Sequence, residues 1–169
     1  MFVADLIFFF FFAFCAASAD SFYKDSRMLN LCHQAPPCGT ATASFEGVTA
    51  YSNGKDQCTG TGCKGHISTG LAYECVELAQ RYFYVKHGIS KIWGVNANGM
   101  CHTHPHGVSR VSSPKAGDLM VLSLGGPFGH VCVVTHVAGE TVTCLEQNNM
   151  PHGTNTYAKS RAQCWLRAG

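Results

Sequence analysis

The stretch Gly70-Leu71-Ala72-Tyr73-Glu74-Cys75-Val76-Glu77-Leu78-Ala79-Gln80-Arg81-Tyr82-Phe83 decides the fold, because it predicts a tight turn, a cysteine and then a helix. One face of that helix is apolar, and its members stand at i, i+4, i+7 and i+8: Cys75, Ala79, Tyr82 and Phe83. Gly88 is the expected stop, since glycine readily takes the left-handed conformation that ends helices. Cys75 therefore lies in the first helical turn.

A cysteine in this place is primed for chemistry. Unpaired backbone N–H groups and the helix dipole favour negative charge at a helix N-terminus, and a thiol must lose its proton before it attacks. The alternative interpretation of Cys75 is a small buried residue or one half of a disulfide bond. The rest of the chain decides between the two.

The N-terminal segment predicts a secretory leader. Residues 6–17 form a phenylalanine-rich apolar run that is shorter than the roughly 20 residues of a membrane span. Ala17-Ser18-Ala19 follows as a small-x-small cleavage pattern. We expect residues 1–19 to be a signal peptide and the mature protein to be secreted, with no membrane anchor once the leader is removed. A membrane anchor is the alternative.

The remaining length and composition suit one folded domain. Without the leader, 12 basic residues face nine acidic ones, a net charge of +3, which weakly indicates a negatively charged partner such as a cell wall. The Lys and Arg residues form no cluster, so a nucleic-acid groove is not expected. Residues 20–46, with Pro36-Pro37, predict an irregular, disulfide-stapled arm, and residues 47–169 are expected to form the main domain.

The cysteine count supports an unbridged Cys75. Nine cysteines remain after the leader, an odd number, so setting Cys75 aside leaves eight for four bridges. Proximity in the chain suggests two pairs, Cys32–Cys38 and Cys58–Cys63. Metal binding by these pairs is the alternative, but neither has the two-residue spacing of a zinc site.

Three histidines stand at alternating positions in Cys101-His102-Thr103-His104-Pro105-His106. On a strand they would share a face and could bind a metal. Pro105 and the flanking glycines favour a loop instead. We therefore expect neither a metal nor a cofactor.

Two β-rich runs, residues 130–136 and 140–146, flank a loop of three residues, 137–139, that ends in glycine. That loop would place three pairs of residues opposite one another on one face: His130 and Glu146, Cys132 and Cys144, and Val134 and Val142. The directly opposed cysteines suit a disulfide, although two buried thiols would also fit. A two-residue turn at 138–139 is the alternative, and it would oppose His130 to Gln147.

A carboxylate that faces a histidine accepts one ring N–H and leaves the other nitrogen to take a proton from a nucleophile. If the face with His130 and Glu146 packs on the apolar side of the helix, Cys75, His130 and Glu146 form a nucleophile, a base and an orienting acid. The alternative is an ordinary solvated histidine at the end of a strand.

Four blocks of sequence, in this order and spacing, resemble a known family: residues 73–82 (YECVELAQRY), 114–119 (PKAGDL), 129–131 (GHV) and 146–148 (EQN). They are similar to the CHAP family, the cysteine, histidine-dependent amidohydrolases/peptidases. The pattern is closest to the amidase domain of glutathionylspermidine synthetase, and the match runs from about Gly47 to about Asn149. Glu74 departs from it, because relatives often carry glutamine there.

The resemblance implies an α+β, papain-like fold in which a nucleophile helix packs on an antiparallel sheet. It also implies a site in which Cys75 is the nucleophile, His130 the general base, Glu146 the orienting acid and Asn148 a polar fourth member.

We therefore expect a monomeric, secreted cysteine amidohydrolase that cuts amide bonds through a thioester. Bacterial peptidoglycan is the expected substrate, which would make the protein antibacterial. A small glutathionylspermidine-like amide is the second possible substrate. The third hypothesis is a disulfide-rich binding protein without catalysis, and it predicts that Cys75 is oxidised to another cysteine.

Overall fold

The computed structural model describes residues 30, 33–54, 62–123, 127–150 and 153–169. The chain divides into two compact units, residues 1–34 and 35–169, and every element named below lies in the second. The predicted signal peptide lies outside the described residues. Within the described ranges, no helix is both long and apolar enough to cross a membrane.

In its described residues, the second unit combines two helices with strands and one 3-10 turn. The helices are α3 (Cys75–His87) and α4 (Ala97–Met100), and the 3-10 turn is η1 (Lys159–Arg161). The strands are β1 (Ala41–Phe45), β2 (Val48–Tyr51), β3 (His66–Ile67), β4 (Gly70–Leu71), β5 (Val108–Val111), β6 (Leu119–Leu122), β7 (His130–Ala138), β8 (Thr141–Glu146), β9 (Gly153–Ala158) and β10 (Ala162–Ala168).

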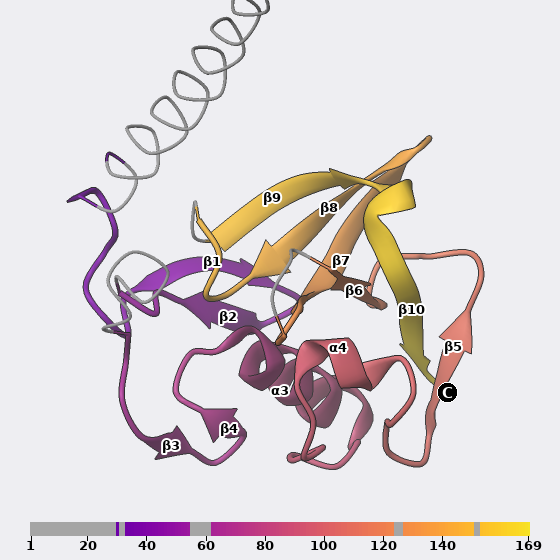
Figure 1. The fold of residues 1–169 in the computed structure, drawn as a ribbon, viewed down its shortest axis with the longest axis horizontal. Coiled ribbons are helices and arrows are strands. Elements are labelled where there is room, and N and C mark those ends of the chain that lie inside the picture. The colour runs from indigo at the N-terminus through magenta and orange to yellow at the C-terminus, as the bar shows by residue number, and fades with distance from the viewer. Residues whose placement is uncertain (1–29, 31–32, 55–61, 124–126, 151–152) are drawn as a thin grey trace, which may run out of the picture. The chain divides into compact units, whose positions relative to one another are not determined.

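Six of the strands form one antiparallel sheet in the order β5-β10-β6-β7-β8-β9 (Figure 1). Two further antiparallel pairs, β1-β2 and β3-β4, lie outside it. Helix α3 packs against β7 and also contacts β2 and β4. The antiparallel sheet and the few helices agree with the predicted α+β class.

Helix α3 begins and ends where the spacing predicts. Its first residue is Cys75, and Gly88 caps its end with a φ of 69° and an N–H that donates to the carbonyls of Phe83 and Tyr84. The predicted apolar face is buried. Glu77 and Gln80 lie off that face and are nevertheless only 1% and 3% exposed, because they join a polar network inside the protein.

The sheet carries apolar side chains on both faces. The cluster that includes the helix takes Leu119, Val121, Val131, Val133 and Leu145 from the sheet. The neighbouring positions form a second cluster, which contains Met120, Leu122, Cys132, Val134 and Cys144. Since side chains alternate along a strand, the two clusters lie on opposite faces, and α3 packs on the face opposite to Cys132 and Cys144.

The predicted register of the β7-β8 hairpin is wrong. Ala138 pairs with Thr141, so the turn has two residues, Gly139 and Glu140, rather than three. Gly139 takes the first turn position with a φ of 53°, and the Thr141 hydroxyl donates to the Ala138 carbonyl at 2.9 Å. The alternative turn at 138–139 is wrong for the same reason.

A bulge between Val134 and His136 adds a second shift, so that Val134 rather than Cys132 lies opposite Cys144. The Thr135 hydroxyl at this bulge donates to the Thr143 carbonyl at 3.1 Å. Beyond the bulge the true register differs from the predicted one by two residues. Because strand side chains alternate with period two, Cys132 and Cys144 still share a face although the predicted opposed pairs are wrong. The expectation that this face packs on the nucleophile helix is wrong as well, because α3 packs on the other face.

The described residues contain three disulfide bonds: Cys38–Cys63, Cys101–Cys164 and Cys132–Cys144. The third was predicted. The first shows that the proposed pairs Cys32–Cys38 and Cys58–Cys63 are wrong, because folding brings Cys38 to a cysteine 25 residues away in the chain. Cys32 and Cys58 themselves lie outside the described residues.

The predicted irregular arm contains regular structure. Its residues 41–45 form β1, which pairs with β2.

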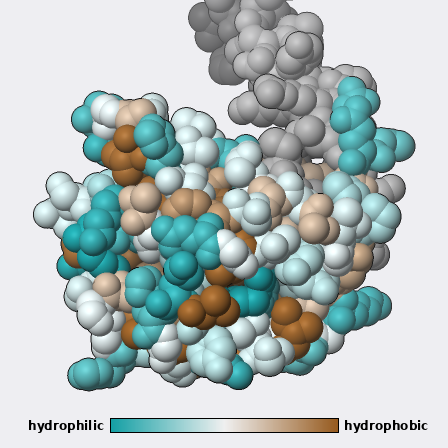
Figure 2. Space-filling model, turned by 180° about the vertical axis from the view of Figure 1, so that it is seen from behind, coloured by the Kyte–Doolittle hydropathy of each residue, from teal (hydrophilic) through white to brown (hydrophobic). Residues whose placement is uncertain are grey.

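The view from behind in Figure 2 shows hydrophobic residues in small separate groups between polar ones. No broad apolar surface is visible on that face.

Candidate active site

Cys75 is the first residue of α3 and is only 9% exposed. Among the cysteines that the structure describes, it alone is outside a disulfide bond. The chain enters the helix through Tyr73, which has a φ of 59°, and through the extended Glu74, whose N–H donates to the Leu71 carbonyl at 3.2 Å. The predicted tight turn therefore presents the thiol at the positive end of the helix dipole.

His130 is the first residue of β7, and its side chain is 3% exposed. Cys75 is close enough to the ring to raise its pKa, and the ring Nε2 lies 3.4 Å from Glu146 Oε2. Since Nε2 faces the carboxylate, Nδ1 is the nitrogen left for the thiol. The structure thus brings together the three predicted residues, from a helix start, a strand start and a strand end.

The charges in this group favour a protonated imidazole. Burial by itself lowers the pKa of His130, but hydrogen bonds to Cys75 and Glu146 and the charges of both outweigh it and raise that pKa. Burial raises the pKa of Glu146, but the hydrogen bond to His130 and its charge outweigh it, so that the pKa of Glu146 is lowered. A buried imidazolium next to a buried carboxylate is the result.

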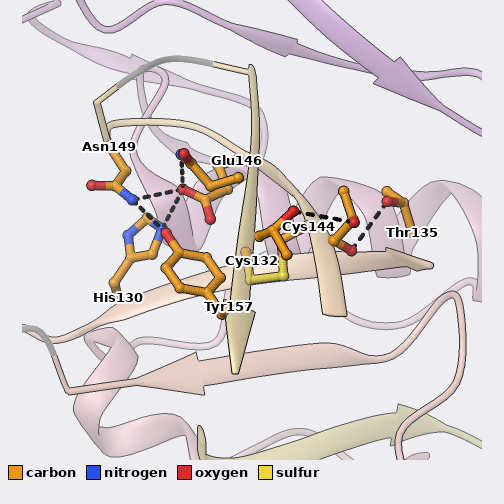
Figure 3. The surroundings of a disulfide bond; sticks show 10 residues. His130, Cys132, Thr135, Cys144, Glu146, Asn149 and Tyr157 are labelled. Carbon is orange, nitrogen blue, oxygen red and sulfur yellow. Dashed lines mark hydrogen bonds and ion pairs between the residues drawn. A yellow bond between two sulfur atoms is a disulfide. The ribbon is translucent and has the colours of Figure 1, made fainter. Parts of the chain in front are cut away.

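Glu146 is held by residues that the sequence did not single out (Figure 3). Its Oε2 accepts from the Asn149 amide at 2.7 Å and from the Asn155 amide at 3.2 Å. Tyr157 is hydrogen-bonded to the same carboxylate, and its hydroxyl accepts from Asn149 at 2.7 Å. Asn155 and Tyr157 belong to β9, so only the pairing of β8 with β9 brings them to Glu146.

Asn148 and Asn149 take different positions. The Asn148 amide donates to the Glu74 carboxylate at 2.5 Å, whereas the Asn149 amide donates to Glu146. Asn148 has a φ of 48°, a left-handed conformation that asparagine tolerates better than most residues. Asn149, which the sequence did not predict, is therefore the one of these two asparagines that contacts Glu146.

Cys75 and His130 line one side of a cleft of about 840 Å³. Glu74, Asn148 and Asn149 add polar groups to it. The cleft also contains three of the most exposed large apolar side chains, Leu71, Ile92 and Phe128, which are 54%, 56% and 66% exposed. The thiol and the imidazole therefore meet where a substrate with both polar and apolar parts has access.

Among the described residues, one cluster of metal-ligating types occurs: Cys132, Cys144 and Glu146. The two sulfur atoms are joined in a disulfide, so they are not available as thiolate ligands. The alternative metal site of the sequence analysis consists of His102, His104 and His106. Two of these, His102 and His106, are exposed, and the three described histidines form no cluster of metal-ligating atoms.

Residues 66–148 match the CHAP domain. The matched segment contains Cys75, His130, Glu146 and Asn148, and it supports the CHAP family that the sequence blocks predicted. The closer likeness to glutathionylspermidine synthetase stays a prediction. No curated protein matches the chain.

Two solved structures resemble the chain. One is titled "The crystal structure of Ly7917", with 19% identity and a TM-score of 0.48. The other is titled "The crystal structure of Ly7917 with the hydrolyzing product of MDP", with 19% identity and a TM-score of 0.50. Each match covers 85% of this chain and 62% of the other. At this identity, the second likeness concerns the fold alone.

Proposed function

We propose that this protein is a secreted cysteine amidohydrolase with a papain-like CHAP domain, and that it cuts amide bonds in bacterial peptidoglycan. The observation that carries the proposal is the unbridged thiol of Cys75, which lines the same cleft as His130 and raises the pKa of its ring, while Glu146 Oε2 lies 3.4 Å from the ring Nε2. A cysteine with only a structural role needs no such partners.

The proposed reaction has two steps. The Cys75 thiolate attacks the carbonyl carbon of the substrate amide, and the imidazolium of His130 gives its proton to the nitrogen as the C–N bond breaks. A thioester and a free amine result. Water then attacks the thioester while His130 takes its proton, which releases the carboxylic acid and restores the thiolate–imidazolium pair.

The helix start supplies the charge stabilisation that this reaction needs. The first N–H groups of a helix have no partner within the helix, and the N–H of Cys75 is the proposed donor to the tetrahedral oxyanion. Glu146 holds the imidazole ring in line, and the amides of Asn149 and Asn155 hold Glu146. Asn148, which lines the cleft on Glu74, is proposed to contact substrate.

Two observations support peptidoglycan as the substrate. The match of residues 66–148 to the CHAP domain supports an amidohydrolase, and the similar structure of Ly7917 was solved with the hydrolysis product of MDP. The predicted leader and the disulfides fit action outside the cell. Since the chain spans only 62% of the length of that protein, its activity is carried over here as a proposal.

The test is mass spectrometry of the products from a defined muropeptide. The wild type should release one new amine and one new carboxylate, whereas Cys75→Ala and His130→Ala should show no turnover. His136→Ala is the matched control, because His136 lies exposed on the same strand, and it should retain wild-type activity.

Glutathionylspermidine serves as the second substrate in the same assay. Turnover of this amide alone would move the proposal to a small-molecule amidase. Failure of the wild type on both, or full activity of Cys75→Ala, would refute the proposed enzyme.

A further inference from the structure

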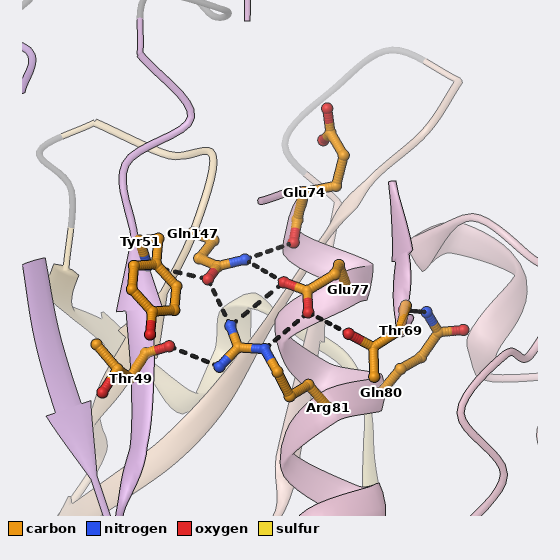
Figure 4. A network of polar contacts seen from close by, with 8 residues as sticks. All are labelled: Thr49, Tyr51, Thr69, Glu74, Glu77, Gln80, Arg81 and Gln147. Atoms are coloured by element: carbon orange, nitrogen blue, oxygen red, sulfur yellow. Dashed lines mark hydrogen bonds and ion pairs between the residues drawn. The ribbon is translucent and has the colours of Figure 1, made fainter. Parts of the chain in front are cut away.

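Gln147 follows Glu146 in the chain and is fully buried. Its amide lies between the start of α3, strand β2 and the end of β8 (Figure 4). The sequence blocks include this residue without assigning it a role. Its contacts differ from those of a side chain that merely fills space.

All hydrogen-bonding positions of this amide are used. The Nε2 donates to the backbone carbonyl of Glu74 at 3.0 Å and to Glu77 Oε2 at 2.8 Å. The Oε1 accepts from the Tyr51 N–H at 2.9 Å and from Arg81 Nη2 at 2.8 Å. A primary amide offers two donors and two acceptor lone pairs, so none remains for another partner.

The partners of Gln147 are themselves fixed. Glu77 is buried and paired with Arg81 at 2.7 Å, and it also accepts from the Thr69 hydroxyl. Arg81 donates in addition to the Thr49 carbonyl of β2 at 2.7 Å. A buried ion pair with all its hydrogen bonds satisfied has a single favourable geometry, so it holds Gln147 in place.

The bond to the Glu74 carbonyl joins the two halves of the site. Glu74 directly precedes Cys75, and Gln147 directly follows Glu146. The covalent path between these two neighbours runs through the whole chain from 74 to 147, whereas the hydrogen bond spans 3.0 Å.

We propose that Gln147 is a positioning residue: its amide sets the first turn of the Cys75 helix against the end of β8, and so fixes the thiol relative to His130 and Glu146. The expected loss of kcat rests on the proposed function. The expected change in the position of the Cys75 thiol does not. Misplacing a reacting group by about 1 Å costs about 100-fold in rate, so the expected loss of kcat without this bond is about 10- to 100-fold.

The test exchanges two side chains, in the double variant Glu77→Gln/Gln147→Glu. The exchange keeps the charge of the cluster, and the amide now at position 77 can donate to the carboxylate now at position 147, the reverse of the wild-type bond. That carboxylate still accepts from Tyr51 and Arg81. The bond to the Glu74 carbonyl has no replacement, because an ionised carboxylate is not a donor. The longer bond from Arg81 Nη2 to Oε2 of residue 77, at 3.3 Å, is lost as well, because the amide nitrogen in that place cannot accept.

Three other variants are measured beside the exchange for comparison. Gln147→Glu alone brings two carboxylates together and should be less stable than the exchange. Gln147→Met keeps the length and loses every hydrogen bond. Arg167→Met is the structural control, because it breaks a second ion pair, Arg167–Asp118 at 2.7 Å, whose residues do not line the cleft. It should lower the melting temperature and leave kcat unchanged.

Two readouts are taken below the melting temperature of each variant: kcat, and the rate at which iodoacetamide alkylates Cys75. The alkylation is followed on the tryptic peptide 65–81, in which Cys75 is the only cysteine. The proposal expects the exchange to regain most of the stability that Gln147→Glu loses, while kcat stays about 10- to 100-fold low and the alkylation rate differs from the wild type.

A folded exchange variant with wild-type kcat and alkylation rate would overturn the proposal. So would failure of both the exchange and Gln147→Met to fold, because Gln147 would then be a folding residue. If the wild type hydrolyses nothing, the proposed function fails, while an altered alkylation rate in the exchange would still support the positioning role.

Discussion

Replacing Glu146 by glutamine removes one negative charge from His130 and leaves an oxygen of similar reach. In the folded protein the pKa of His130 is raised from its ordinary 6.5 to about 10, to which both Cys75 and Glu146 contribute. Glu146→Gln takes away one of these two causes. The pKa of His130 should therefore fall in the variant.

The size of the fall follows from the geometry. At an effective dielectric constant of about 20, unit charges 3.4 Å apart attract by about 5 kcal/mol, which would equal about 3.6 pKa units. That is an upper bound, since the whole rise in the pKa of His130 is shared with Cys75. An opposite charge at this range shifts a pKa by about 1 to 3 units, so we expect a fall of about 2 units.

Two measurements check this value. The first is the pH dependence of kcat/KM, whose alkaline limb reports loss of the proton that the imidazolium gives to the leaving amine. This limb should move to lower pH by about 2 units in Glu146→Gln. The second is NMR titration of the His130 ring, whose signal is identified by its absence in His130→Asn, and which needs no substrate.

The same shift affects stability with a definite sign. A pKa raised on folding contributes stability that is fully present below pH 6.5 and is lost as the pH rises through about 10. Glu146→Gln should lose that stabilisation at lower pH than the wild type does. The coupling between Glu146 and His130 would be refuted if Glu146→Gln, with wild-type circular dichroism, kept the wild-type midpoint both in the alkaline limb of kcat/KM and in the NMR titration of the His130 ring.

Two further predictions concern the scaffold. Gly129→Ala should lower the free energy of unfolding more than Gly139→Ala: both positions have positive φ, which costs about 1 to 2 kcal/mol for alanine, but only at Gly129 would the new Cβ overlap Asn98. Equal urea midpoints for the two variants would contradict this steric argument. Removing the Cys132–Cys144 disulfide by a double alanine substitution should cost about 2 to 3 kcal/mol, because the bridge closes a short loop in the unfolded chain. An unchanged urea midpoint would show that the bridge adds nothing.

Local pattern sufficed for the nucleophile helix. Its apolar face and its glycine stop depend on neighbours within one or two turns, so Cys75 is placed at the first residue by the sequence alone. That Cys132 and Cys144 share one side of the sheet was also predictable, because a strand alternates with period two whatever its register, but that this side faces away from the helix was not.

The register itself was not predictable from the loop sequence. A glycine near a hairpin turn fits more than one turn type, and the choice depends on hydrogen bonds such as Thr141 to Ala138. The bulge at Thr135 adds a further shift that leaves no mark in the hydrophobic pattern. The predicted pairs were therefore wrong by two residues.

The sequence by itself determined a helix that begins with a cysteine, an antiparallel sheet and the residue types of a thiol–imidazole–carboxylate group. Only the tertiary structure decided that Cys38 pairs with Cys63, that Asn149 holds Glu146, and that Gln147 joins Glu74 to Glu77. The physical reason is the distance along the chain between the residues that contact each other. Helix and strand periodicity comes from contacts a few residues apart, whereas these bonds join segments whose meeting depends on how the whole chain packs.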